Sequence, residues 1–137
     1  MKKEIEKYHY NQTGAELILY EDDVILVEYA RATYNVEENN EETRWIRDAF
    51  YKVAEKYPKK KFKIILDVTK PGSGEEMSDE VKEIYVQLLK DPKILKVAVF
   101  GQTWAFQLFL DLFAALSRNN KLKSFPSMEK AVAWINK

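Results

Sequence analysis

The residues best suited to chemistry in this sequence are polar side chains that follow two apolar, β-branched runs. Asp67 and Thr69 follow the first run, and Gln102 and Thr103 follow the second. Ser78 begins a helix predicted between the two runs. In an open parallel sheet, ligands collect beyond the carboxyl ends of the strands, and helix N-termini can hold anions. The pattern therefore indicates a candidate anion site, with helix capping and loop hydrogen bonds as the alternative interpretation.

The chain has few side chains of the types that catalyse reactions. The sequence contains no cysteine and a single histidine, His9, which excludes thiolate sites and leaves almost nothing for histidine-based acid–base or zinc chemistry. Asp67 would serve phosphotransfer or magnesium binding only with a second carboxylate beside it, and the other predicted strands supply no evident one. We therefore expect no enzyme, no metal site and no cofactor.

Charge and hydropathy limit the kinds of partner that the protein is expected to bind and the cellular compartment in which it is expected. The chain has 137 residues, with 22 basic side chains balanced by 22 acidic ones. That balance argues against a nucleic-acid binder, which would carry a basic excess. The most apolar run, residues 104–116, is shorter than the ~20 residues that span a bilayer. The basic start has no apolar signal-peptide region, so a cytoplasmic protein without a membrane span is expected.

Residues 104–116 form the most unusual predicted element, a helix that is apolar on nearly all sides. Trp104, Phe106, Phe109 and Phe113 can share one broad face of it. One sheet face cannot cover such a helix, so neighbouring helices, a second copy of the chain or an apolar ligand must do so. We predict that a second copy or an apolar ligand covers the four aromatic side chains.

The elements that position these residues alternate along the chain. After a polar N-terminal tail, residues 1–14, a single domain is expected over residues 15–137. Alternating strands and helices predict an α/β fold with a mostly parallel sheet of about five strands, an antiparallel N-terminal edge strand and four helices. The strands are expected at residues 17–20, 24–29, 62–67, 97–100 and 121–125. Of the four helices, the first ends before Pro58, the second begins at Ser78, the third covers residues 104–116 and the fourth begins at Ser127.

The start of the first helix is open between two capping patterns. Asn35 with Glu38, and Asn39 with Glu42, both place a cap residue three positions before an acidic one. Both positions precede an apolar stripe of spacing three and four. The stripe consists of Trp45, Ile46, Ala49, Phe50, Val53 and Tyr57.

Three segments of the sequence resemble a known fold family. They are residues 64–69 (IILDVT), residues 96–101 (KVAVFG) and residues 125–135 (FPSMEKAVAWI), together with the helix that opens at Ser78. This pattern resembles the STAS-type fold of bacterial anti-sigma-factor antagonists. It is more similar still to small STAS/SEC14-like bacterial proteins. The resemblance covers residues 15–137 and concerns architecture, so it implies a STAS-like fold more than an activity.

The resemblance also implies a phosphorylation site. In the antagonists, a partner kinase phosphorylates a serine at the start of the helix after the aspartate-containing strand, and Ser78 is the matching residue here. Two features depart from that pattern. The acidic residue, Asp79, follows the serine instead of preceding it, and residues 72–74 lengthen the spacer. Helix capping is therefore the preferred role of Ser78.

Two functions are expected from these observations. The first is a non-enzymatic regulatory or protein-interaction module of STAS-like fold that acts as a homodimer or with a protein partner. The alternative, implied by the SEC14-like resemblance, is a carrier of a small apolar ligand such as a lipid or fatty acid. An enclosed apolar cavity would favour the carrier, and a flat exposed apolar patch would favour the interaction module.

Overall fold

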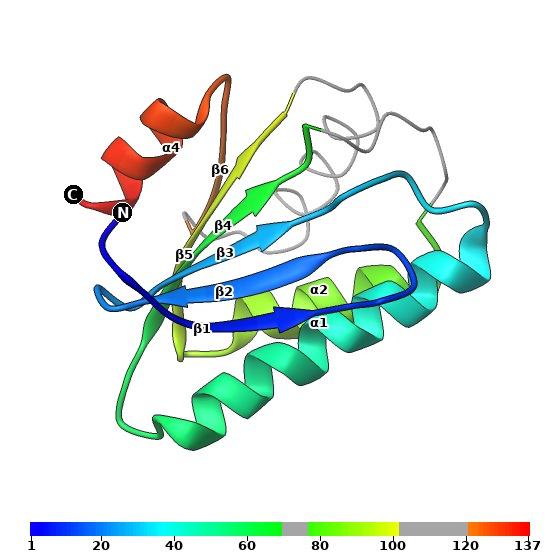
Figure 1. The fold of residues 1–137 in the computed structure, drawn as a ribbon, viewed down its shortest axis with the longest axis horizontal. Coiled ribbons are helices and arrows are strands. Elements are labelled where there is room, and N and C mark those ends of the chain that lie inside the picture. Colours follow the sequence, from blue (N-terminus) through cyan, green and yellow to red (C-terminus); the bar gives the residue numbers. More distant parts are fainter. Residues whose placement is uncertain (70–76, 102–120) are drawn as a thin grey trace.

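One mixed sheet organises the computed structural model, which describes residues 1–69, 77–101 and 121–137 (Figure 1). Six strands of the described residues lie in the sheet in chain order. The first three are antiparallel neighbours, and the third to the sixth are parallel. The strands are β1 (Glu4–His9), β2 (Glu16–Tyr20), β3 (Val24–Glu28), β4 (Phe62–Asp67), β5 (Ile94–Phe100) and β6 (Leu122–Phe125).

Two of the strands expected from the sequence, residues 62–67 and 97–100, form the centre of the sheet as β4 and β5. β4 and β5 are parallel neighbours, with Ile65 opposite Ala98, and both residues are fully buried. Runs that are apolar at every position suit strands covered on both faces. The predicted α/β class and mostly parallel sheet with an antiparallel edge are confirmed.

The predicted number of strands is wrong by one. The sequence predicts about five strands and interprets residues 1–14 as a tail or a weak extended segment, whereas Glu4–His9 form β1 and pair with β2. Most β1 side chains are exposed, and Tyr8 packs on the core. An edge strand needs only one backbone partner and can keep charged side chains in water, so its sequence lacks the apolar run of a buried strand. A register shift between Glu4 and Glu6 also bends this edge.

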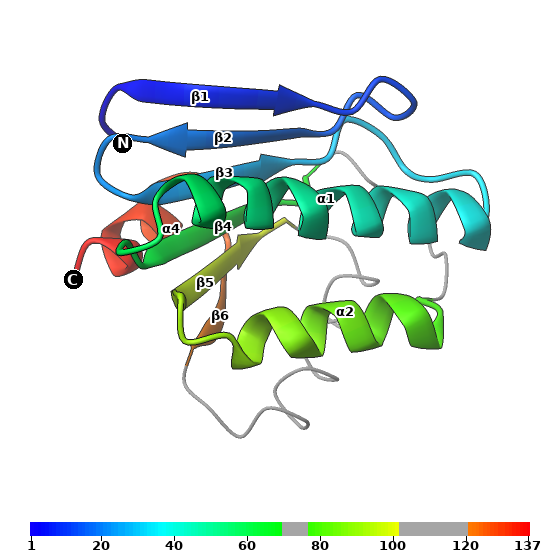
Figure 2. The same cartoon turned by 90° about the horizontal axis from the view of Figure 1, so that it is seen from below.

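Helices cover both faces of the sheet (Figure 2). α1 (Val36–Lys56) and α2 (Asp79–Lys90) contact each other on one face, and α4 (Met128–Ile135) packs against β4, β5 and β6 on the other. The described residues thus contain three helices where four are predicted. The fourth prediction, residues 104–116, lies outside the described residues.

Local hydrogen bonds explain where the elements begin and turn. Asn35 is the N-cap of α1, and its side-chain oxygen accepts a bond from the Glu38 amide at 2.8 Å, which decides the open start of this helix. The β2–β3 turn contains no glycine. Asp23 supplies its left-handed backbone, with φ 65°, a conformation that aspartate tolerates better than most residues.

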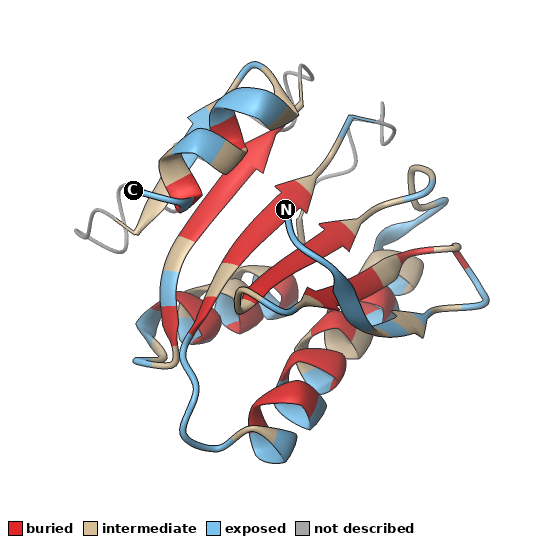
Figure 3. Ribbon diagram, turned by 60° about the vertical axis from the view of Figure 1, so that its left-hand side comes forward, coloured by how far each residue is buried: buried red, intermediate tan, exposed pale blue. Residues whose placement is uncertain are grey.

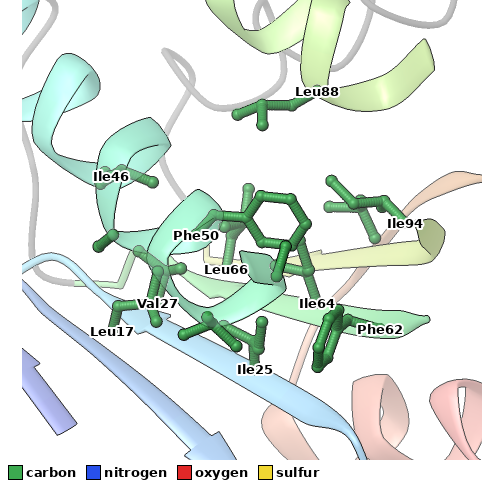
Figure 4. Packing of buried hydrophobic residues seen from close by; sticks show 14 of the residues in the cluster. Leu17, Ile25, Val27, Ile46, Phe50, Phe62, Ile64, Leu66, Leu88 and Ile94 are labelled. Carbon is green, nitrogen blue, oxygen red and sulfur yellow. The ribbon is translucent and has the colours of Figure 1, made fainter. Parts of the chain in front are cut away.

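The larger core lies between the sheet and the pair α1 and α2 (Figures 3 and 4). The rings of Phe50 and Phe62 meet edge to face, with centroids 6.0 Å apart, and both side chains are buried. No helix of the described ranges has both the length and the apolar character needed to cross a membrane.

Candidate functional site

Asp67 and Thr69 lie together at the carboxyl end of β4, as predicted, but they form hydrogen bonds with each other. The Asp67 Oδ1 atom accepts bonds from the Thr69 amide at 3.0 Å and from the Thr69 hydroxyl at 2.7 Å. This is the local turn in which an aspartate bonds to the backbone two residues on. The geometry supports the alternative interpretation of these two residues, which is loop hydrogen bonding.

Ser78 links two helices. Its hydroxyl accepts a bond from the Val81 amide at 3.1 Å, which caps α2, and donates to Asn40 Oδ1 of α1 at 2.5 Å. Asn40 is buried. The predicted capping role of Ser78 is confirmed, and the sequence gives no hint of the second bond. Phosphorylation of this half-buried hydroxyl would remove the bond that Ser78 donates to Asn40. Phosphorylation at Ser78 stays a prediction.

Replacing Ser78 by alanine is expected to lower the free energy of unfolding by about 0.5–2 kcal/mol. The substitution removes the α2 cap and leaves the buried Asn40 oxygen without its donor. Urea unfolding measures the change, and Ser127→Ala, which removes a cap of the same kind from α4, is the matched control. A Ser78→Ala protein as stable as the wild type would contradict the structural role. Stoichiometric phosphoserine at Ser78 in protein from its own source would support the phosphorylation hypothesis.

The remaining predicted site residues cannot be placed. Gln102 and Thr103 of the candidate anion site lie outside the described residues. The same holds for the aromatic face of the predicted fourth helix. That face consists of Trp104, Phe106, Phe109 and Phe113.

An apolar cavity lies inside the larger core, between α1, α2 and the sheet. The cavity has a volume of about 40 Å³. One water molecule needs ~10–15 Å³ on the same measure. Apart from Tyr85, every described residue that lines it is aliphatic or phenylalanine. Figure 4 shows Phe50 of α1 and Leu88 of α2 above Ile64 and Leu66 of β4. The lining consists of Leu17, Ile25, Val27, Ile46, Phe50, Ile64, Leu66, Tyr85, Leu88, Leu89, Ile94, Val97 and Leu122.

A tyrosine pair joins this cavity to the carboxyl end of β3. The hydroxyls of Tyr29, directly after β3, and Tyr85, on α2, lie 2.7 Å apart. Burial raises the pKa of Tyr85 to about 12 and the pKa of Tyr29 well above its ordinary value. Both hydroxyls therefore stay protonated at neutral pH and can each donate and accept a hydrogen bond.

Glu42 is a buried carboxyl beside this pair. The residue is 3% exposed, and its Oε2 atom has no hydrogen-bond partner, a condition it shares with Asp22 Oδ1 among the described residues. Burial raises the pKa of Glu42, while the nearby Thr13 hydroxyl opposes that rise. The charge of Glu42 in turn raises the pKa of both Tyr29 and Tyr85.

In the capping pattern of Asn39, Glu42 is the acidic residue three positions after the cap. Its spacing carried a further signal, because Glu42 precedes Ile46, Ala49 and Phe50 by four, seven and eight positions. That places a carboxyl on the buried stripe of α1. A charged residue on the core-facing stripe of a helix is uncommon enough to indicate a special role.

Comparisons with protein-family models, with curated proteins and with solved structures found no match. No group of three acidic or histidine side chains within residues 1–69, 77–101 and 121–137 is arranged to hold a metal ion.

Proposed function

We propose that this protein is a non-enzymatic module that binds a small apolar molecule in the cavity between α1, α2 and the sheet. One observation supports the proposal. The cavity is lined by apolar side chains inside a core that is otherwise buried and packed. Protein interiors contain few voids larger than a water molecule, and apolar voids stay dry and accept apolar guests. Ligand sites typically combine such a lining with few polar groups.

The size of the cavity limits the ligand. An engineered cavity of ~150 Å³ binds benzene or xenon, and the space here is about 40 Å³. A group of a few carbon atoms is therefore the expected occupant. A lipid or fatty acid, the ligand class that the SEC14-like resemblance implies, would require α1 and α2 to separate.

The regulatory interaction module with a STAS-like fold has less support from the described residues. Their exposed large apolar side chains are spread over different elements and do not suggest one docking face. That function, with the predicted homodimer, still rests on residues 104–113, which the structure does not describe. The exposed side chains are Met1, Ile5, Tyr34, Val36, Tyr51 and Leu95.

Filling the cavity is expected to abolish binding of a small apolar guest. Val97 of β5 lines the cavity, so Val97→Ile places an extra methylene in it. Val24 of β3 lies in the core on the opposite sheet face, so Val24→Ile is a matched control. Xenon or propane should raise the thermal unfolding midpoint of the wild type and of Val24→Ile by mass action. It should leave Val97→Ile unchanged. Equal effects on all three proteins, or on none, would contradict the proposal.

A further inference from the structure

The unpartnered oxygen of Glu42 needs a physical explanation. A buried polar atom without a hydrogen bond lowers stability by about 1–3 kcal/mol, and nearly all such atoms in native proteins have a partner. The Oε2 atom of Glu42 is buried and has no hydrogen-bond partner. An acceptor held in the interior in this way is suited to a donor that the protein itself does not supply.

The cation that lowers the pKa of Glu42, Arg31, already has other partners. Arg31 donates to both carboxylate oxygens of Glu38, at 2.7 and 3.1 Å, and to the backbone oxygens of Gln12 and Ala32. It lowers the pKa of Glu42 without bonding to it, whereas Glu38 raises that pKa. The charge of Glu42 is thus not neutralised by a direct ion pair with Arg31.

Glu42 lies one helical turn from the apolar cavity. Ile46, four residues later on the same buried stripe of α1, lines the cavity. Tyr85 also lines it, and its hydroxyl bonds to Tyr29. Tyr85 thus brings the hydroxyl pair to the edge of the apolar space, and Glu42 lies on the buried stripe of α1 one turn before Ile46. The charge of Glu42 also raises the pKa of both tyrosines.

We infer that Glu42 and the Tyr29–Tyr85 pair bind the hydrogen-bond-donating end of the ligand, a hydroxyl or a primary ammonium group, whose apolar part fills the cavity. This inference rests on the proposed function and names its ligand class. A carboxylate or phosphate is disfavoured, because its negative charge would face the acidic side chain of Glu42.

Four ligands that share a three-carbon chain test this inference. They are propane, 1-propanol, propylamine and propionate, each titrated into the wild type and followed by the NMR shifts of the cavity methyl groups. 1-Propanol or propylamine should bind at least about tenfold more tightly than propionate, since a bond to a charged acceptor contributes that much. In Glu42→Gln the preference for propylamine should be lost, whereas Glu41→Gln, an identical change at an exposed position, should keep it.

The outcomes separate the two proposals. A preference for propylamine that Glu42→Gln removes assigns an ammonium ligand. A preference for 1-propanol that Glu42→Gln weakens assigns a hydroxyl ligand. Propane binding without any preference among the other three compounds would overturn the inference and leave the proposed function intact. If none of the four compounds binds, propane included, both are wrong.

Discussion

Replacing Phe50 by alanine is expected to lower the free energy of unfolding by about 3–5 kcal/mol, the range for removing a buried aromatic ring. Phe50 is buried, packs edge to face on Phe62 and lines the cavity between α1, α2 and the sheet. The loss is expected near the upper end of the range. The Phe50 ring lines the cavity, so its removal enlarges the cavity and deletes contacts that no neighbouring side chain can replace.

Urea unfolding of Phe50→Ala beside Tyr51→Ala provides the matched comparison. Tyr51 is the next residue, is 40% exposed and bonds through its hydroxyl to Asp91 at 3.0 Å, so its loss should cost much less. Benzene should restore part of the stability of Phe50→Ala, because the enlarged cavity can accept it. Equal losses in the two variants would show that Phe50 is not part of the packed core described here.

Glu42→Gln is expected to stabilise the protein at neutral pH by about 1–3 kcal/mol, because it removes the charge of a buried carboxyl while keeping its shape. The pKa of Glu42 is higher in the folded protein than in the unfolded chain. The folded state therefore retains a proton that the unfolded chain releases. Wild-type stability should fall as the pH rises from the unfolded pKa through the folded pKa, and then level off.

Free energies of unfolding measured between pH about 4 and about 8 test this sign. The advantage of Glu42→Gln over the wild type should grow across that window, and Glu41→Gln should show no such growth. A Glu42→Gln protein that is less stable than the wild type at neutral pH would mean that the carboxylate contributes to the fold. If the expected gain is found, Glu42 lowers stability in the native protein, as functional groups often do.

Much of the fold could be predicted from its hydrophobic patterns. β4 and β5 are apolar enough to be recognised as buried neighbours, and Ser78 and Ser127 mark the starts of α2 and α4. β1 could not be predicted in the same way, because its partner supplies backbone bonds that leave no hydrophobic pattern. The choice of Asn35 over Asn39 as the α1 cap also depended on tertiary contacts, since Glu38 is held by Arg31.

The candidate site was less accessible to prediction. The polar residues after β4 were identified correctly by position, but Asp67 and Thr69 bond to each other. The cavity depends on how side chains from seven elements fill a volume, which no local pattern specifies. The tyrosine pair joins residues 56 positions apart. Of these features, only Glu42 could be detected from the sequence, because its charge lies on the apolar stripe of its helix.

Methyl NMR under xenon pressure tests the binding of an apolar guest in the cavity most directly, because each core methyl group reports its own surroundings. Saturable shifts are expected for four residues that line the cavity, Ile46, Ile64, Leu88 and Val97. No such shifts are expected for Val24, Ile18 and Ile135 in the core on the opposite sheet face. Uniform small shifts across both cores, or saturable shifts confined to the opposite face, would contradict the proposed function.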